Sequence, residues 1–347
     1  MQLYRYRPIG PFLFKELRYR ELYMAAYAEL NDPQDLSCTV NFHSTDVKAV
    51  EALAHFICKQ LIKAHGVVKF AIIHKNKLIT TEKLCAFLLS AFRTPGTTKV
   101  LIDQLASLIH QYYVTNVNPT FSSFDEPKAS ELANELNKVI DNFIKNSSVA
   151  CFTTTFDNFL MWSHYANGHN GVCLGYKTEN EETNRCNVMC AVGPSPEGEE
   201  LEFLIDVDRV RYSDVIKPIE FYEFCNAFIN EGDTDLMNLS KSKWHQYSDY
   251  IKNMFLNKLD PWSYEQEWRL VNVEFKQSMP EDKMLKYASE SLKDVYFGVN
   301  CDVYSQLRIY NILGNCVSYY KCRLNGSNRL DTEELSMESV LDSYRYG

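Results

Sequence analysis

The sequence lacks the features that would assign it to several broad classes of protein. It has no run of about 20 apolar residues, so no segment is expected to cross a bilayer as a helix. Residues 1–7 lack the apolar core of a signal peptide. There is no long run of lysine and arginine, and the formal net charge is −9, which argues against nonspecific nucleic-acid binding. We therefore expect a cytoplasmic protein without membrane association.

The short motifs of common metal and nucleotide sites are also missing. The eleven cysteines include no Cys-x-x-Cys pair, and the closest relevant spacing is Cys186-x-x-x-Cys190. Zinc sites usually show tighter pairs, so we expect no metal and interpret most thiols as reduced core residues. Neither Gly-x-Gly-x-x-Gly nor Gly-x-x-x-x-Gly-Lys-Ser/Thr occurs, so neither a Rossmann nor a P-loop nucleotide site is indicated.

The 347 residues contain 46% hydrophobic and 13% aromatic side chains, enough for a sizeable core. Strand-like apolar runs occur near both ends without regular alternation with helices. This predicts an α+β fold with a mixed or antiparallel sheet rather than a doubly wound one. The expected organisation is a core of residues 1–40 plus 149–325, a helical insertion at 41–148, and an acidic C-terminal tail at 326–347.

The helical insertion is predicted from apolar residues at helical spacing. A stripe from Val47 to Leu61 and a second from Leu132 to Ile144 recur every three to four positions. A further helical stretch is expected around 235–259. The alternative is that residues 41–148 are simply the helical half of a single domain.

The run from 160 to 170 combines an indole, a hydroxyl, two imidazoles and a phenol within about three helical turns. These side chains either form a buried polar cluster or face a ligand. Adjacent residues on a helix point in different directions, so Ser163 and His164 do not suit a nucleophilic pair. His164 and His169 are five positions apart, which is poor spacing for metal ligands. The candidates for a ligand site are Trp162, Ser163, His164 and Tyr165.

A second run, at 264–269, places two carboxylates two residues apart. In a strand, Glu265 and Glu267 would point to the same face. Two close carboxylates raise the pKa of one of them, which suits general acid–base chemistry. Neighbouring aromatic rings could stack on a base or a nicotinamide, and Arg269 could bind a phosphate or pair with a glutamate. The alternative is a solvent-exposed face with a salt bridge.

Two arginines on the first expected strand are candidates for binding an anion. Arg5 and Arg7 would lie on one face of that strand, with Tyr4 and Tyr6 on the other. A half-buried arginine must find either a protein carboxylate or a ligand phosphate. The protein carboxylate is the more common partner.

Several short motifs follow one another along the chain. They are Leu-Tyr-x-Tyr-Arg at 3–7, Glu-Leu-Tyr at 21–23, Asn-Asp-Pro-x-Asp at 31–35, Met-Trp-Ser-His-Tyr-Ala at 161–166, Gly-Val-Cys-Leu-Gly-Tyr at 171–176, Tyr-Glu-x-Glu-Trp-Arg-Leu at 264–270 and Asp-Val-Tyr-Phe-Gly at 294–298. Together they resemble the bacterial domain-of-unknown-function family numbered 2971. The region from about 40 to 148 is left as a variable insert. A departure is the turn at 30–34, which that family commonly flanks with aromatic residues.

The order of three features is also distantly similar to ADP-ribosyltransferases. Those enzymes carry an arginine or histidine on the first strand, a hydroxyl-rich strand in the middle, and a glutamate, often in Glu-x-Glu, near the end. Arg5 or Arg7, the threonine run containing Thr154, and the pair Glu265 and Glu267 occur in that order. The departures are that threonines replace the expected Ser-Thr-Ser pattern and that either arginine could match.

This similarity implies an ADP-ribosyltransferase-like fold and NAD as a substrate. Glu267 would stabilise the charge that develops as nicotinamide leaves, and Glu265 would orient or deprotonate an acceptor. A bacterial toxin or phage-defence effector would fit such an activity. The acceptor, a protein or a nucleic acid, and the oligomeric state are left open. The residues implied to bind NAD are Arg5, Arg7, Thr154, Trp162, Ser163, Tyr165 and Arg269, with His164 supporting the nicotinamide pocket.

Two other functions remain open at the level of the sequence. The first is a nucleic-acid-acting hydrolase, in which the carboxylates and His164 cleave a phosphodiester and the insertion holds RNA. The second is a non-enzymatic sensor or binding module, in which the aromatic runs are core and the insertion binds a partner.

Overall fold

The computed structural model describes residues 1–32, 35, 40–41, 147–179, 185–194, 200–215, 219–220, 252–272, 283–325 and 330–346. The chain divides into two units. The first comprises residues 1–32, 147–214 and 256–347, and the second comprises 33–146 and 215–255. Apart from its end residues, the predicted helical insertion at 41–148 lies outside the described residues. Most of the helix predicted around 235–259 does so as well.

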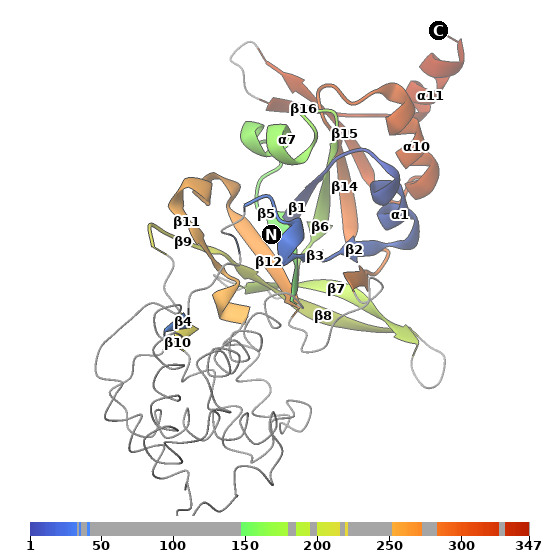
Figure 1. The fold of residues 1–347 in the computed structure, drawn as a ribbon. Coiled ribbons are helices and arrows are strands. Elements are labelled where there is room, and N and C mark those ends of the chain that lie inside the picture. Colours follow the sequence, from blue (N-terminus) through green and yellow to red (C-terminus); the bar gives the residue numbers. More distant parts are fainter. Residues whose placement is uncertain are drawn as a thin grey trace, which may run out of the picture. The chain divides into compact units, whose positions relative to one another are not determined.

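The first unit is built on an open, mostly antiparallel sheet (Figure 1). Its ten strands follow the order β16-β15-β14-β6-β1-β5-β12-β8-β7, and β3 pairs with β5 off this path. Among these described strands, only β14 and β15 pair in parallel. This confirms a mixed sheet. The strands are β1 (Gln2–Arg7), β3 (Ala25–Ala26), β5 (Ser148–Thr153), β6 (Val172–Lys177), β7 (Arg185–Pro194), β8 (Glu200–Arg209), β12 (Glu267–Asn272), β14 (Leu292–Phe297), β15 (Ser318–Leu324) and β16 (Leu330–Glu334).

Three shorter strand pairs lie outside the main sheet. β2 (Glu21–Tyr23) pairs with β13 (Met284–Lys286), and β9 (Arg211–Ser213) pairs in parallel with β11 (Asn257–Leu259). β4 (Val40–Asn41) pairs with β10 (Ile219–Glu220) within the second unit. The prediction of a helix around 235–259 is therefore wrong at its C-terminal end, because residues 257–259 form a strand that pairs with β9.

The described helices are few and short. They are α1 (Pro11–Tyr19), α7 (Phe159–Tyr165), α10 (Val303–Leu313) and α11 (Met337–Tyr346), with 3-10 helices η1 (Tyr27–Glu29) and η3 (Asp260–Glu265). None of the helices in the described part of the chain is long and apolar enough to span a membrane.

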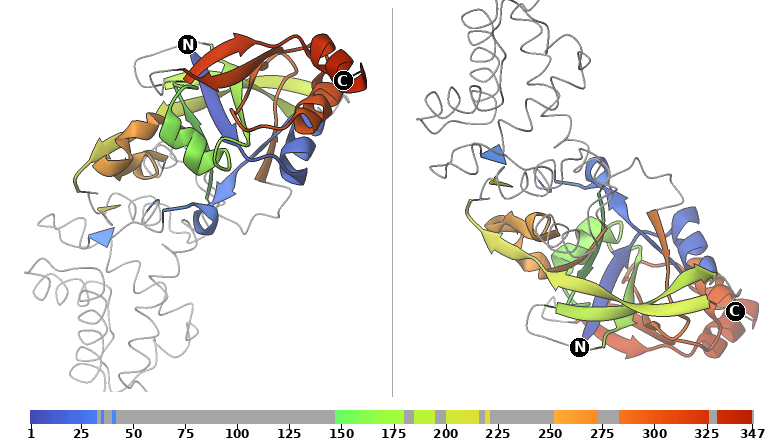
Figure 2. Two further views of the ribbon diagram at one scale, coloured as in Figure 1. Left: turned by 90° about the horizontal axis from the view of Figure 1, so that it is seen from above. Right: turned by 90° about the horizontal axis from the view of Figure 1, so that it is seen from below.

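The alternation of β1 separates two cores on the two faces of the sheet. Leu3 packs with Leu13 and Leu17 of α1 in the larger core, to which α10 also contributes. Tyr4 and Tyr6 belong to a smaller aromatic core that contains residues of α7. Accordingly, α7 lies on the opposite side of the sheet from α1 and α10 (Figure 2). The predicted alternation of tyrosines and arginines along this strand is confirmed.

The segment after α7 is fixed by tight backbone packing. Asn167, Gly168 and His169 all have positive φ, at 49°, 61° and 67°, a region that costs energy for residues other than glycine. The carbonyl oxygen of His169 accepts a hydrogen bond from the Asn300 N–H at 3.0 Å. A Cβ atom at Gly298 would lie 2.2 Å from that same oxygen, so only glycine fits there.

The residues predicted as an acidic C-terminal tail form β16 and α11 within the first unit. β16 pairs antiparallel with β15, and an exposed ion pair joins Arg323 to Glu333 at 2.7 Å. Met337 at the start of α11 is buried in the larger core. Buried Met337, the partly buried Leu335, Val340 and Leu341, and pairing with β15 thus order a segment whose acidic residues remain exposed.

Substituting Gly298 by alanine is expected to destabilise the first unit by about 1–3 kcal/mol or more, because its Cβ would overlap backbone atoms that cannot rotate away. Chemical denaturation of the full-length protein measures the change. The matched control is Gly10→Ala, where a Cβ meets nothing within 4 Å. Equal stability of the two variants would contradict the close approach of these loops.

Candidate active site

Glu265 and Glu267 reach the same buried region from two different elements. Glu265 ends η3, and Glu267 begins β12. Gln266 between them has φ 46° and ψ 48°, a left-handed conformation, and its N–H donates to the Ser263 carbonyl at 3.2 Å. The expectation that both glutamates share one strand is therefore wrong, since the chain turns between them. Their proximity is nevertheless retained, because both contact one lysine.

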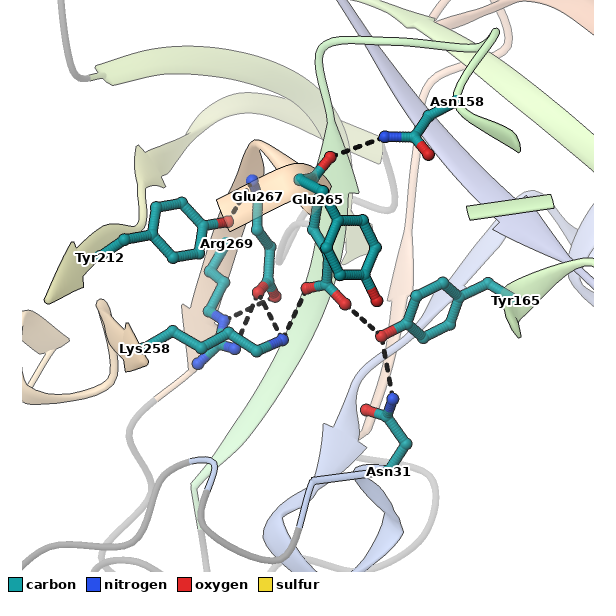
Figure 3. A network of polar contacts seen from close by, with 9 residues as sticks. Asn31, Asn158, Tyr165, Tyr212, Lys258, Glu265, Glu267 and Arg269 are labelled. Carbon is teal, nitrogen blue, oxygen red and sulfur yellow. Dashed lines mark hydrogen bonds and ion pairs between the residues drawn. The ribbon is translucent and has the colours of Figure 1, made fainter. Parts of the chain in front are cut away.

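That lysine is Lys258 on β11. Its Nζ lies 2.6 Å from Glu265 Oε2 and 3.1 Å from Glu267 Oε2 (Figure 3). All three side chains are buried. Sequence reasoning missed this residue, because a lone lysine within a stretch predicted to be helical carries no distinguishing signal. The pairing of β11 with β9 places this lysine beside the two glutamates.

Both carboxylate oxygens and the backbone N–H of Glu267 have hydrogen-bond partners. Arg269, which is fully buried, donates from Nε to Oε1 at 2.7 Å and from Nη2 to Oε2 at 2.9 Å. The backbone N–H of Glu267 donates to the Tyr212 hydroxyl at 2.8 Å. Burial raises the pKa of Glu267, but the charges of Arg269 and Lys258 outweigh it and lower this pKa to about 2. Glu267 is therefore a firmly ionised, immobilised carboxylate.

Glu265 occupies the outer end of the network. Its Oε1 accepts a hydrogen bond from the Tyr165 hydroxyl at 2.5 Å, and that hydroxyl accepts one from the exposed Asn31 amide at 2.9 Å. Burial and the charge of Glu267 raise the pKa of Glu265, while Lys258 lowers it, and the net effect is a raised pKa. Burial and the neighbouring Glu265 also raise the pKa of Tyr165. Glu265 is therefore the member of the pair best suited to exchange a proton.

Four aromatic side chains form a series of ring contacts that includes Tyr165, the hydrogen-bond partner of Glu265, and we call them the aromatic rim. His164 lies between two of the others, with its ring centroid 6.3 Å from that of Tyr165 and 6.4 Å from that of Tyr264. Trp262 lies 6.2 Å from Tyr264, and Lys258 Nζ lies 4.9 Å from the Trp262 ring. His164 is exposed and the other three are half-buried. The rim consists of His164, Tyr165, Trp262 and Tyr264.

Asn158 joins α7 to η3 and so brings the two aromatic runs together. Its side-chain oxygen caps α7 by accepting from the Leu160 and Met161 N–H groups at 3.0 and 3.3 Å. Its amide nitrogen donates to the Tyr264 carbonyl at 2.7 Å (Figure 3). The cap thus positions both Tyr165 and Tyr264.

The remaining candidates on this side of the sheet have other environments. Trp162 is fully buried, and its indole N–H donates to the Phe156 carbonyl at 2.7 Å, so it is a core residue. Ser163 is exposed. Thr154 donates from its hydroxyl to the Gln266 side chain at 2.8 Å and so contacts the linker between the two glutamates.

The two strand arginines lie on the other side of the sheet. Thr153 pairs with both Tyr4 and Glu267, which places Glu267 on the face of the tyrosines. Arg7 on the opposite face forms a bidentate pair with Glu16, with both distances 2.9 Å. Arg5 donates to the Tyr23 carbonyl at 2.7 Å. The structure therefore does not bring these arginines together with the glutamates.

Comparison with known proteins gives a match to a protein family over part of the chain. A model of the family described as "Protein of unknown function (DUF2971)" matches residues 161–270. This segment begins in α7 and ends in β12, so it contains both glutamates, Lys258 and the aromatic rim. No curated protein and no solved structure matches the chain. Within the residues that the structure covers, no group of three or more His, Cys, Asp or Glu side chains could hold a metal ion.

Replacing Glu267 by glutamine is expected to lower the free energy of unfolding at pH 7 by about 3–5 kcal/mol, because Arg269 loses its buried counter-charge. A lowered pKa means that ionised Glu267 stabilises the fold above its unfolded-state pKa, and that this contribution is lost as the pH falls towards about 2. Denaturation at a series of pH values should therefore show the difference between wild type and variant narrowing in acid.

The matched control for this substitution is Glu333→Gln, which removes an exposed carboxylate from β16. It should change stability by less than about 1 kcal/mol. A gap between wild type and Glu267→Gln that stays constant down to the acid transition would be inconsistent with a buried ion pair.

Proposed function

We propose that this protein is an NAD-consuming enzyme of the ADP-ribosyltransferase type, with Glu265 as the reacting carboxylate. The observation that carries the proposal is the position of Glu265. It joins a buried network of charges to the aromatic rim, and Lys258 and Tyr165 each hold one of its oxygens. In this proposal the reaction breaks the bond between nicotinamide and ribose, releases nicotinamide, and forms a new bond between the ribose and either water or an acceptor group.

The chemistry of that bond explains the choice. Departure of nicotinamide leaves positive charge on the ribose, and a preorganised carboxylate stabilises such charge most effectively where water is excluded. Glu265 is only 2% exposed. The aromatic rim supplies rings on which a flat nicotinamide can stack. The hydroxyl of Tyr165 and the amide of Asn31 are suitable hydrogen-bonding partners for a ribose.

The two glutamates have different roles in this proposal. The similarity to ADP-ribosyltransferases assigns the ribose to Glu267, but both oxygens of that residue accept hydrogen bonds from cations, whereas Oε1 of Glu265 accepts from the neutral Tyr165 hydroxyl. We therefore assign the reacting role to Glu265 and a supporting role to Glu267. Arg5 and Arg7 lie on the opposite face, so the proposal covers the nicotinamide and ribose of NAD and leaves the diphosphate to other residues. Depletion of NAD would suit a toxin or a phage-defence effector.

A second candidate is a binding module that recognises a planar ligand without turnover. Complete burial of Trp162 and the closed pairing of Glu267 with Arg269 favour it, because both are features of a stable core. The fluorescence of Trp262 distinguishes the two. Quenching by NAD without release of nicotinamide favours the binding module, and Trp262→Phe should remove the signal.

Incubation of the purified full-length protein with about 1 mM NAD should release nicotinamide, measured by chromatography. Glu265→Gln is expected to lower the rate by at least about 100-fold, because the amide cannot stabilise the developing charge. Glu333→Gln on β16 is the matched control and should retain the wild-type rate. Full turnover by Glu265→Gln, or no release by the wild type, would falsify the assignment. RNA cleavage without NAD would instead favour a nuclease.

A further inference from the structure

We infer that Lys258 is a positioning residue that keeps Glu265 ionised and thereby selects the carboxylate that reacts. This inference rests on the proposed function. It begins with an asymmetry between the two glutamates. Glu267 has two cationic partners, Arg269 and Lys258. Within the part of the chain that the structure describes, Lys258 is the only cation in an ion pair with Glu265.

This asymmetry between the two glutamates matters because the network is buried. The side chains of Lys258 and Glu265 are each 3% exposed, so water screens their interaction little. Without the ammonium group, two carboxylates would share a site with one guanidinium. One of them would then take up a proton. Arg269 binds Glu267 through two hydrogen bonds, so the proton would go to Glu265.

The groups around Glu265 support the same outcome. Within the described residues, the groups that act on it directly are the Lys258 ammonium on β11, the Tyr165 hydroxyl on α7 and the charge of Glu267 on β12. Around these lie the phenols of Tyr212 on β9 and Tyr264 on η3, the exposed imidazole of His164 on α7, the amide of Asn31 bonded to Tyr165, and Arg269 on β12 and Cys151 on β5, both bonded to Glu267.

The backbone fixes the lysine in place. Lys258 pairs with Tyr212 in the parallel β9–β11 ladder, and the Tyr212 hydroxyl accepts the Glu267 N–H. The ammonium also lies 4.9 Å from the Trp262 ring, a cation–π contact. The β9–β11 pair therefore positions Lys258 and, through Tyr212, the backbone of Glu267. The fold thus sets the distances within the network.

The test is the pH dependence of kcat for nicotinamide release by the full-length protein. Lys258→Met keeps an unbranched side chain but removes the charge. It should move the acid limb of the profile upward by at least about one pH unit, so that the rate falls tenfold or more in acid and recovers in alkali. Lys258→Arg should restore most of the wild-type profile. A uniform loss of rate at every pH would overturn the inference.

The matched control is Lys177→Met, which removes an exposed lysine paired with Glu179 on the surface. Its pH profile should equal that of the wild type. Circular dichroism verifies folding of each variant. If Lys258→Met does not fold, Lys258→Gln, which retains hydrogen-bond donors without charge, takes its place and is expected to show the same upward shift.

A readout independent of turnover separates this inference from the proposed function. Trp262 lies next to Lys258, so its fluorescence should titrate with the network, and Trp262→Phe identifies its share of the signal. The midpoint should rise by at least about one pH unit in Lys258→Met. An unchanged midpoint overturns the role of Lys258 even if NAD is consumed. A shifted midpoint in a protein that releases no nicotinamide supports it while the proposed function fails.

Discussion

The burial of two carboxylates and two cations in one network is the constraint on which the candidate site depends. Removing charges from water is costly, and the cost is offset only when every charge has a close partner. Lys258, Glu265, Glu267 and Arg269 satisfy this condition with contacts of 2.6–3.1 Å. Because these residues come from η3, β11 and β12, the network aligns three elements that backbone pairing alone would position less tightly.

The aromatic run of α7 divides its side chains between the core and the site. Trp162 fills the smaller core beneath the helix, and its indole N–H is bonded to a backbone carbonyl. Tyr165, three residues later, reaches Glu265 instead. One aromatic run thus contributes both to the core and to the site. The Asn158 cap fixes the start of α7 and with it the directions in which Trp162 and Tyr165 point.

The part of the fold that could be predicted is the part that depends on local pattern. Alternation in β1 and apolar runs at β5, β6 and β14 indicated strands, and their irregular spacing indicated a mixed sheet. Lys258, Tyr212 and Asn31 could not be recognised, because each is a single polar residue whose partner lies far away in sequence or in another element. The sheet face of Arg7 was predictable, but the choice of Glu16 as its counter-ion required the docking of α1.

The sequence by itself determined which chemical groups are concentrated where, since composition and spacing are properties of the chain. It identified the aromatic run at 160–170 and the Glu-x-Glu pair as unusual. Only the tertiary structure decided how the two glutamates differ. Charge, burial and hydrogen-bond partners are set by neighbours from other elements, so Glu267 became a locked counter-ion of Arg269. Glu265, held by Lys258 and Tyr165, became the carboxylate with the raised pKa.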